Sequence, residues 1–170
     1  MRLRPARPAD APAMCDLLNP IIAEGSTTAH REPFDSAKMI ARYIAPPRLA
    51  SCVTAWEGDR LVGFQMLEWP DPDWTDWGSV PADWGLIASF VARDAQGRGA
   101  GRAMFVATLD IARAAGMAAI DATIRADNRA GLAYYTGLGF VDYDRVTGVP
   151  LGDGTKVDRI RKCYAIVPQV

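Results

Sequence analysis

Three glycines at alternate positions are the clearest sign of chemistry in this sequence. Gly97, Gly99 and Gly101 lie in the stretch DAQGRGAGRAMF, residues 94–105, directly before residues that favour a helix. A glycine loses more conformational entropy on folding than any other residue, so this cluster needs a physical reason. A strand that ends in such a loop and continues as a helix presents unpaired backbone N–H groups at the positive end of the helix dipole. The cluster therefore predicts a site for an anion, and phosphate fits it.

The spacing of the glycines excludes two of the known phosphate-binding loops. The Walker pattern needs a Lys-Ser or Lys-Thr pair after a glycine, and none follows here. The dinucleotide pattern G-x-G-x-x-G fails in both registers because Arg102 and Met104 occupy its last position. Taken alone, the loop has a second interpretation as a tight turn that binds nothing. The pattern that fits is Q/R-x-x-G-x-G/A, formed by Gln96, Gly97, Arg98, Gly99, Ala100 and Gly101.

A second motif follows one predicted strand later. In NRAGLAYYTGLGF, an asparagine is followed by a small residue, a tyrosine and a closing Gly-Phe, which are Asn128, Gly131, Tyr135, Gly139 and Phe140. Together the two motifs resemble the GCN5-related N-acetyltransferase (GNAT) family, in which the first motif holds the pyrophosphate of acetyl-coenzyme A. The opening LLNPIIAEGSTTAHREPF, residues 17–34, is similar to the phosphinothricin and methionine-sulfoximine acetyltransferase branch.

The elements that must position these motifs alternate between strands and helices. A helix is expected to begin near Asp10 and to be bent or ended by Pro20. The order of the elements and the resemblance to the GNAT family predict an α/β (α+β) fold. We expect a mixed, mostly antiparallel sheet of about six to seven strands with about four flanking helices, in one acetyltransferase domain, 1–170. The expected strands are 2–6, two in a hairpin over 51–69, 85–93, 118–124, 139–146 and 156–167; the later helices are 35–45, 102–115 and 128–138.

The resemblance implies a role for each part of the two motifs. In the family, a bulge splays the strand before the loop, and backbone groups there bind the pantetheine arm and the thioester carbonyl. Tyr135 has the family's general-acid position, and Tyr134 lies about 100° further round the helix, so only one of the two is expected to face the coenzyme. Arg98 and Arg102 would pair with phosphates, or are solvated cations at the helix start. The coenzyme site implied is Phe90, Val91, Gln96, Gly97, Arg98, Gly99, Ala100, Gly101, Arg102, Asn128 and Tyr135.

The general base is the least determined part of the site. A primary amine is mostly protonated at neutral pH and must lose a proton before it attacks a thioester. Related enzymes often carry a glutamate where this sequence has Leu86. Our first choice for the base is Glu68. The alternatives are Asp83, Asp121, His30 and a water relayed by backbone carbonyls.

A segment rich in tryptophan and aspartate, EWPDPDWTDWGSVPADW, precedes the strand that leads to the glycines. Aromatic faces and carboxylates would suit one wall of a pocket for a cationic amine. The same residues would also suit a lid over the core or a subunit contact, since tryptophan is enriched at interfaces. On this basis we expect a homodimer.

Composition limits the class of partner. The chain has 19 Lys plus Arg against 20 Asp plus Glu, which leaves no charge excess for nucleic acid or an anionic membrane. Cys15, Cys52 and Cys163 have no C-x-x-C spacing, so we expect reduced cysteines, no metal site and a cytoplasmic location. No apolar stretch approaches the length of a membrane span.

The function predicted is acetyl-CoA-dependent N-acetylation of a primary amine on a small molecule, an amino acid or amino-acid analogue. Acetyl-CoA is then the co-substrate. One alternative is acetylation of a protein N-terminus or lysine. Another is a non-catalytic acyl-CoA-binding regulatory module, which Leu86 favours and Tyr135 opposes.

Overall fold

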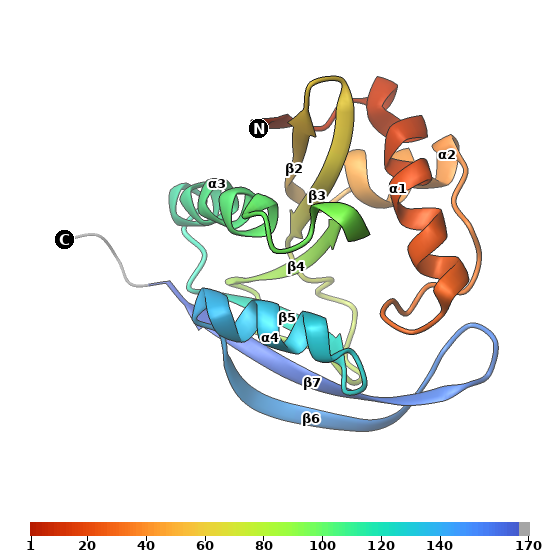
Figure 1. Cartoon of the computed structure of the whole chain (residues 1–170). Helices are drawn as coiled ribbons and strands as arrows, with labels where there is room; N and C mark the ends of the chain where they lie inside the picture. The colour runs from red at the N-terminus through yellow and green to blue at the C-terminus, as the bar shows by residue number, and fades with distance from the viewer. Residues whose placement is uncertain (167–170) are drawn as a thin grey trace.

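Seven strands form one sheet in the order β1-β2-β3-β4-β5-β7-β6 (Figure 1). The structure is a computed structural model, and it describes residues 1–166. Neighbouring strands are antiparallel except β4 and β5, which are parallel. The strands are β1 (Arg2–Pro5), β2 (Leu49–Glu57), β3 (Arg60–Glu68), β4 (Trp84–Val91), β5 (Ala119–Arg125), β6 (Val141–Pro150) and β7 (Lys156–Ala165).

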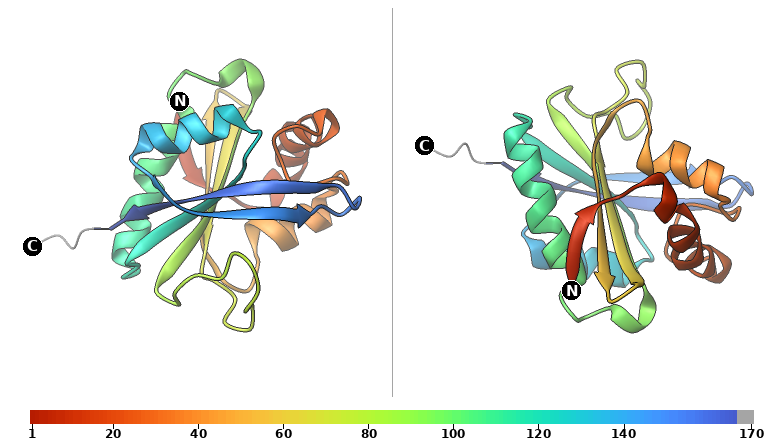
Figure 2. Two further views of the ribbon diagram at one scale, coloured as in Figure 1. Left: turned by 90° about the horizontal axis from the view of Figure 1, so that it is seen from below. Right: turned by 90° about the horizontal axis from the view of Figure 1, so that it is seen from above.

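Helices cover both faces of the sheet. Figure 2 shows α3 (Ala100–Ala114) and α4 (Arg129–Leu138) on one side, and α1 (Ala11–Glu24) and α2 (Ser36–Met39) on the other. α2 continues as a π-helical turn, η2 (Ile40–Ile44). Short 3-10 turns precede α1, η1 (Pro8–Asp10), and the glycine loop, η3 (Arg93–Ala95). The predicted fold class, a mostly antiparallel sheet with four helices, is therefore confirmed.

Periodic apolar residues and local caps determine where the helices lie. In α3, Met104, Phe105, Leu109 and Ala112 are buried at helical spacing, which seats the helix on the sheet. The helix α4 begins where the Asn128 side chain accepts a hydrogen bond from a backbone N–H, and α2 begins with the same kind of cap at Asp35.

Several predicted boundaries differ from the structure. Pro20 lies inside α1, which continues to Glu24 and ends at Gly25 with φ 70°. Pro20 and Asp16, whose carbonyl would otherwise accept a hydrogen bond from residue 20, are both exposed residues, which makes this proline tolerable. β6 runs to Pro150, beyond the predicted strand end at residue 146. The last residue of the predicted final strand, 167, lies outside the described residues.

β4 and β5 part after a short parallel stretch. They pair only from Trp84–Ala119 to Leu86–Asp121, whereas β4 continues beside β3 to Val91. The register of β3 with β4 runs without a shift, so the bulge implied by the family resemblance is absent from this pairing. Beyond Leu86, the edge of β4 that faces β5 has no sheet partner among the described residues. The divergence of β4 from β5, and not a bulge, leaves the backbone of β4 after Leu86 unpaired on this edge.

Candidate active site

Two of the three loop glycines adopt a backbone conformation that other residues rarely reach. Gly97 has φ 74° and Gly99 has φ 89°, and a Cβ at either position would meet open space. Gly99 is the N-cap of α3, and because it has no side chain it cannot accept a hydrogen bond from the first N–H groups of the helix. The loop therefore combines a left-handed backbone, open space and the positive end of a 15-residue helix.

Gly101 has a different reason to be glycine. A Cβ there would lie 2.6 Å from the ring of Tyr134 on α4. The Tyr134 hydroxyl donates a hydrogen bond to the Gly101 carbonyl, with a 2.9 Å O···O distance. The third glycine of the motif thus makes room for a side chain of the protein itself and joins α3 to α4.

The charged and polar residues near the loop already have partners in the protein. Arg98 pairs with Glu57 at 3.0 Å, and Arg102 donates to the Gly137 carbonyl at 2.9 Å. Both arginine side chains are exposed enough to exchange these contacts for others. Asn128 caps α4 by accepting from the Gly131 N–H at 2.9 Å. Gln96 donates to the Val91 carbonyl at 3.3 Å, and Asn128 donates to the Thr27 carbonyl at 3.1 Å.

The hydroxyls of Tyr134 and Tyr135 converge on one pair of residues in β3 and β4. The Tyr135 hydroxyl lies 3.0 Å from Ser89 Oγ, and Tyr134 accepts from Gln65 Nε2 at 3.2 Å. Gln65 Nε2 also donates to Ser89 Oγ at 2.8 Å. Adjacent tyrosines on one helix turn thus reach the same site, although their positions differ by about 100° around the axis.

Burial determines the protonation state of these tyrosines. Tyr135 is 7% exposed, and burial raises its pKa well above the ordinary value. Burial also raises the pKa of Tyr134, while hydrogen bonds from Ser89 and Gln65 act to lower it. Both hydroxyls therefore carry their protons at neutral pH. Gln65 is fully buried, and its Oε1 has no hydrogen-bond partner among the described residues.

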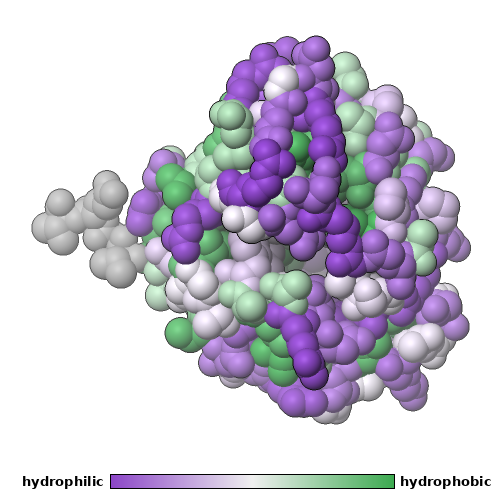
Figure 3. All heavy atoms as spheres, in the orientation of Figure 1, coloured by the Kyte–Doolittle hydropathy of each residue, from purple (hydrophilic) through white to green (hydrophobic). Residues whose placement is uncertain are grey.

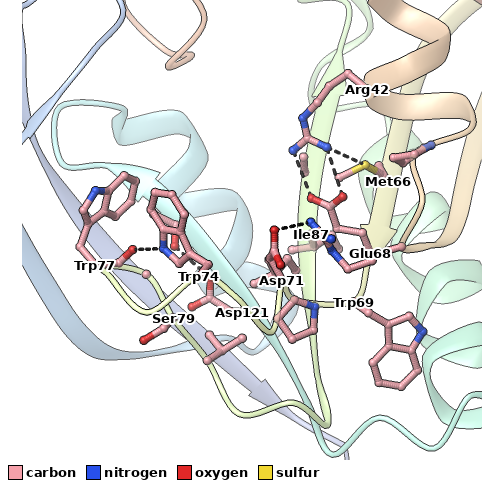
Figure 4. A pocket seen from close by; sticks show the side chains of 18 of the residues that line it. Arg42, Met66, Glu68, Trp69, Asp71, Trp74, Trp77, Ser79, Ile87 and Asp121 are labelled. Carbon is pink, nitrogen blue, oxygen red and sulfur yellow. Dashed lines mark hydrogen bonds and ion pairs between the residues drawn. The ribbon is translucent and has the colours of Figure 1, made fainter.

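A pocket of about 590 Å³ opens on the face of the sheet opposite the two tyrosines, beside η2. Neighbouring residues of a strand point to opposite faces, so Leu86 and Ala88 line this pocket while Ser89 meets Tyr135 of α4. Figure 4 shows Trp74 and Trp77 on one side of the pocket and Glu68 with Arg42 on the other. The Trp-rich segment thus contributes Trp69, Trp74 and Trp77 to the wall.

Three residues in register across β3, β4 and β5 form the floor of the pocket. Glu68 pairs with Leu86, and Leu86 pairs with Asp121. The position where related enzymes often have a glutamate therefore lies between two carboxylates. Glu68 is held by Arg42, with nitrogen to oxygen distances of 3.2 and 3.3 Å.

Asp121 is the more buried of these carboxylates, at 3% exposure. It accepts hydrogen bonds from the Tyr143 hydroxyl and from Thr123 Oγ1, the latter at 2.9 Å. The guanidinium of Arg161 lies 3.4 Å away. Burial raises the pKa of Asp121, and Tyr143, Arg161 and Thr123 oppose that shift.

The structure does not bring the other two base candidates to the pocket. Asp83 is exposed and does not line it. His30 Nε2 lies 2.6 Å from the Tyr43 hydroxyl, away from the pocket lining. Burial, with the positive charges of Arg42, Lys38 and Arg159, lowers the pKa of His30 to about 4. The imidazole is therefore neutral at pH 7.

Comparisons with known proteins identify the family and the fold of the chain. The sequence model of the Acetyltransferase (GNAT) family matches residues 13–140, so the chain belongs to that family. No curated protein matches the sequence. The fold is similar to that of yncA from Salmonella typhimurium, solved with its cofactor acetyl-CoA (TM-score 0.79, 20% identity, 99% of this chain and 95% of that chain).

Two further solved structures differ in the acceptor that their names give. One is a ribosomal-protein-alanine N-acetyltransferase from Brucella melitensis (TM-score 0.78, 19% identity, 97% of this chain and 99% of that one). The other is described as a phosphinothricin N-acetyltransferase (TM-score 0.77, 19% identity, 98% of each chain). At these identities the likeness establishes the fold. Membership of the GNAT family, shown by the family model, makes this chain an N-acetyltransferase that uses acetyl-CoA.

Two negative findings hold for residues 1–166. Within this range, no helix has both the length and the apolar character needed to cross a membrane. The same residues contain no cluster of three or more His, Cys, Asp or Glu side chains with the geometry to hold a metal ion.

Sequence reasoning missed several residues of the two sites. Gln65 and Ser89 support the tyrosines, and Arg42 holds Glu68. A signal existed for Gln65, because it is the one strongly polar residue inside the otherwise apolar run LVGFQML. None existed for Arg42, whose role depends on how η2 packs against the end of β3.

Proposed function

We propose that the acceptor is the primary amine of a small molecule, an amino acid or amino-acid analogue. The observation that carries this proposal is the walled pocket of about 590 Å³ under the Trp-rich segment. A volume of that size suits a small ligand. Its floor, at Leu86, lies where β4 and β5 part, so an amine in the pocket would approach an acetyl group held between the strands.

The proposed coenzyme site lies on the opposite face. The N–H groups of residues 97–101 and the start of α3 would hold the pyrophosphate, with Arg98 and Arg102 free to exchange their present partners for phosphate oxygens. Backbone groups near Phe90 and Val91, on the edge of β4 beyond its pairing with β5, would hold the pantetheine arm and the thioester oxygen. Asn128 would act by fixing the start of α4.

Tyr135 is the proposed proton donor to the departing thiolate. Its raised pKa keeps the hydroxyl protonated, and Ser89 holds it in place at 3.0 Å. Glu68 is the proposed base. It would take a proton from the acceptor ammonium, directly or through water, before the amine nitrogen bonds to the carbonyl carbon. The nitrogen then releases its second proton to water as the C–S bond breaks and Tyr135 protonates the thiolate. Asp121, on the other side of Leu86, is the second candidate for the base.

Three wider proposals accompany the site. We propose one domain over residues 1–170, a cytoplasmic location and a homodimer. The free state of Cys15, Cys52 and Cys163 supports the proposed cytoplasmic location. The proposed homodimer is supported by Trp74, which is 49% exposed beside the pocket.

The experiment that tests the acceptor class is a thiol-release assay with acetyl-CoA. One set of acceptors contains small amines, including free amino acids, and the other contains short peptides with a free N-terminus or an internal lysine. We expect the highest kcat/KM among the small amines by about tenfold or more. A higher value for the peptides would favour protein acetylation. Saturable coenzyme binding without transfer to any acceptor would favour a regulatory module.

A further inference from the structure

Arg159 differs from every other charged residue of the acceptor pocket. The pocket is lined by Arg42, Arg48 and Arg159 and by Glu68, Asp71 and Asp121. Arg42 pairs with Glu68, Arg48 with Asp71 and Arg161, behind the wall, with Asp121. Arg159 on β7 has no ion pair and no hydrogen bond from its guanidinium to any residue in 1–166, and its Nε is buried without a partner. Arg161 also pairs with Asp144, so Arg159 is the one guanidinium of the pocket lining without a carboxylate partner in residues 1–166.

The surroundings of Arg159 make this charge costly. The residue is 9% exposed, and its guanidinium lies 5.1 Å from the centre of the Trp77 ring. Its cross-strand neighbour on β5 is Arg125, another cation, and burial together with Arg125 lowers the pKa of Arg159. Arg125 has its own partners in Asp127 and two backbone carbonyls. A largely buried guanidinium that has no partner in the protein, and whose Nε is buried without an acceptor, gains from an anion.

We infer that Arg159 is an anion subsite of the acceptor pocket, so that the acceptor is an amine that also carries a carboxylate or a comparable acidic group. This inference rests on the proposed function. The fork of a guanidinium binds two carboxylate oxygens at once, and the Trp77 ring lies 5.1 Å from this guanidinium. The other two arginines of the lining already bind carboxylates of the protein, so an acidic group of the acceptor would bind to Arg159. The α-amine of a protein N-terminus carries no adjacent carboxylate, so this subsite favours small amino acids over proteins.

The test compares acceptors that differ only in this charge. L-Amino acids and ω-amino acids are assayed by thiol release beside the carboxamide of each. We expect the wild-type chain to prefer the acids by about tenfold or more in kcat/KM, mainly through KM. The Arg159→Gln variant should lose that preference while its acetyl-CoA affinity stays unchanged. Arg145→Gln, on the exposed side of β6, is the control and should keep it.

Two outcomes overturn the inference and leave the proposed function standing. They are equal use of acids and carboxamides by the wild type, and a preference for acids that survives in Arg159→Gln. If Arg159→Gln fails to fold, Arg159→Lys serves instead, and the preference should fall because lysine lacks the bidentate fork.

A binding measurement separates the two proposals if no small amine is acetylated. Absence of transfer counts against the proposed function. Trp77 lies against the guanidinium, so titration with N-acetylglycinate is followed by tryptophan fluorescence, with N-acetylglycinamide as the uncharged match. The subsite is supported if tryptophan fluorescence changes saturably with N-acetylglycinate and not with N-acetylglycinamide, and if this change is lost in Arg159→Gln or Arg159→Lys. No change, or equal change with both compounds, overturns it.

Discussion

At the scale of single residues, the two tyrosines of α4 can be separated by experiment. We expect Tyr135→Phe to lower kcat at saturating acetyl-CoA by about 10- to 100-fold, because the departing thiolate loses its proton donor. The affinity for the coenzyme should stay nearly unchanged. Steady-state kinetics and equilibrium binding measure both quantities.

Tyr134→Phe is the matched control for this substitution. It removes the hydrogen bond to Gly101 and should weaken coenzyme binding more than it lowers kcat. An unaltered kcat in Tyr135→Phe would remove Tyr135 from the mechanism. A larger fall in Tyr134→Phe would assign the role of proton donor to its neighbour.

The two carboxylates beside Leu86 should respond differently to neutralisation. Glu68→Gln is expected to lower kcat/KM about 100-fold at neutral pH, because the acceptor ammonium loses its base. Its cost in the free energy of unfolding should be below about 1 kcal/mol, since the Arg42 to Glu68 pair is partly exposed. Asp121→Asn should cost about 2 to 3 kcal/mol, because Arg161 loses a buried counter-charge.

Urea unfolding and thiol release on both variants test this contrast. If Asp121→Asn folds stably and loses more activity than Glu68→Gln, Asp121 takes over as the base. Equal activity of Glu68→Gln and the wild type would leave water as the acceptor of the proton.

His30 gives the fold a dependence on pH. Its pKa is about 4 in the folded chain, against an ordinary value of 6.5, so only the unfolded chain binds this proton between those pH values. Stability should therefore fall as the pH drops from about 6.5 to about 4, by up to about 3 kcal/mol, reduced by solvent screening of the partly exposed ring. Thermal unfolding from pH 7.5 to 4.5 measures the slope. His30→Gln should show a smaller slope, and identical slopes would contradict this assignment.

At the scale of elements, the proposed coenzyme site depends on the glycine loop at the start of α3. We expect Gly99→Val to abolish detectable binding of acetyl-CoA, because φ 89° is unfavourable for valine and its side chain would occupy the open space in front of the helix. Gly116→Val at the other end of α3 is a close control, with φ 75° and the same open surroundings.

Equilibrium dialysis with acetyl-CoA and thermal unfolding compare the two glycine variants. Both should lose similar stability, about 1 to 2 kcal/mol, because both strain a left-handed backbone. Only Gly99→Val should lose the coenzyme. Normal binding by Gly99→Val would mean that the loop is only a turn.

The elements also show what the sequence could predict. The glycine motif and the Asn128 motif are contiguous in the chain, so their spacing was enough to predict the family and the fold class. The pocket depends on strand register, which sets Glu68, Leu86 and Asp121 side by side from three strands. No local pattern contains that information. The reason for Gly101 was likewise not local, because the Tyr134 ring comes from the next helix.

At the scale of the whole molecule, the sheet separates the two sites that we propose for the coenzyme and the acceptor. The glycine loop and α4 with its tyrosines lie on one face, and the Trp-walled pocket lies on the other. The two meet only where β4 and β5 part, after Leu86 and Asp121. Figure 3 shows a surface on which hydrophilic residues predominate and hydrophobic residues are scattered.

The measurement that most directly tests this account is a calorimetric titration of the protein with acetyl-CoA, with coenzyme A and NADH titrated in parallel. We expect saturable binding of acetyl-CoA in the micromolar range and no binding of NADH, because the loop has the spacing of the acetyltransferase motif and lacks the dinucleotide spacing. Absence of binding, or equal binding of NADH, would contradict it.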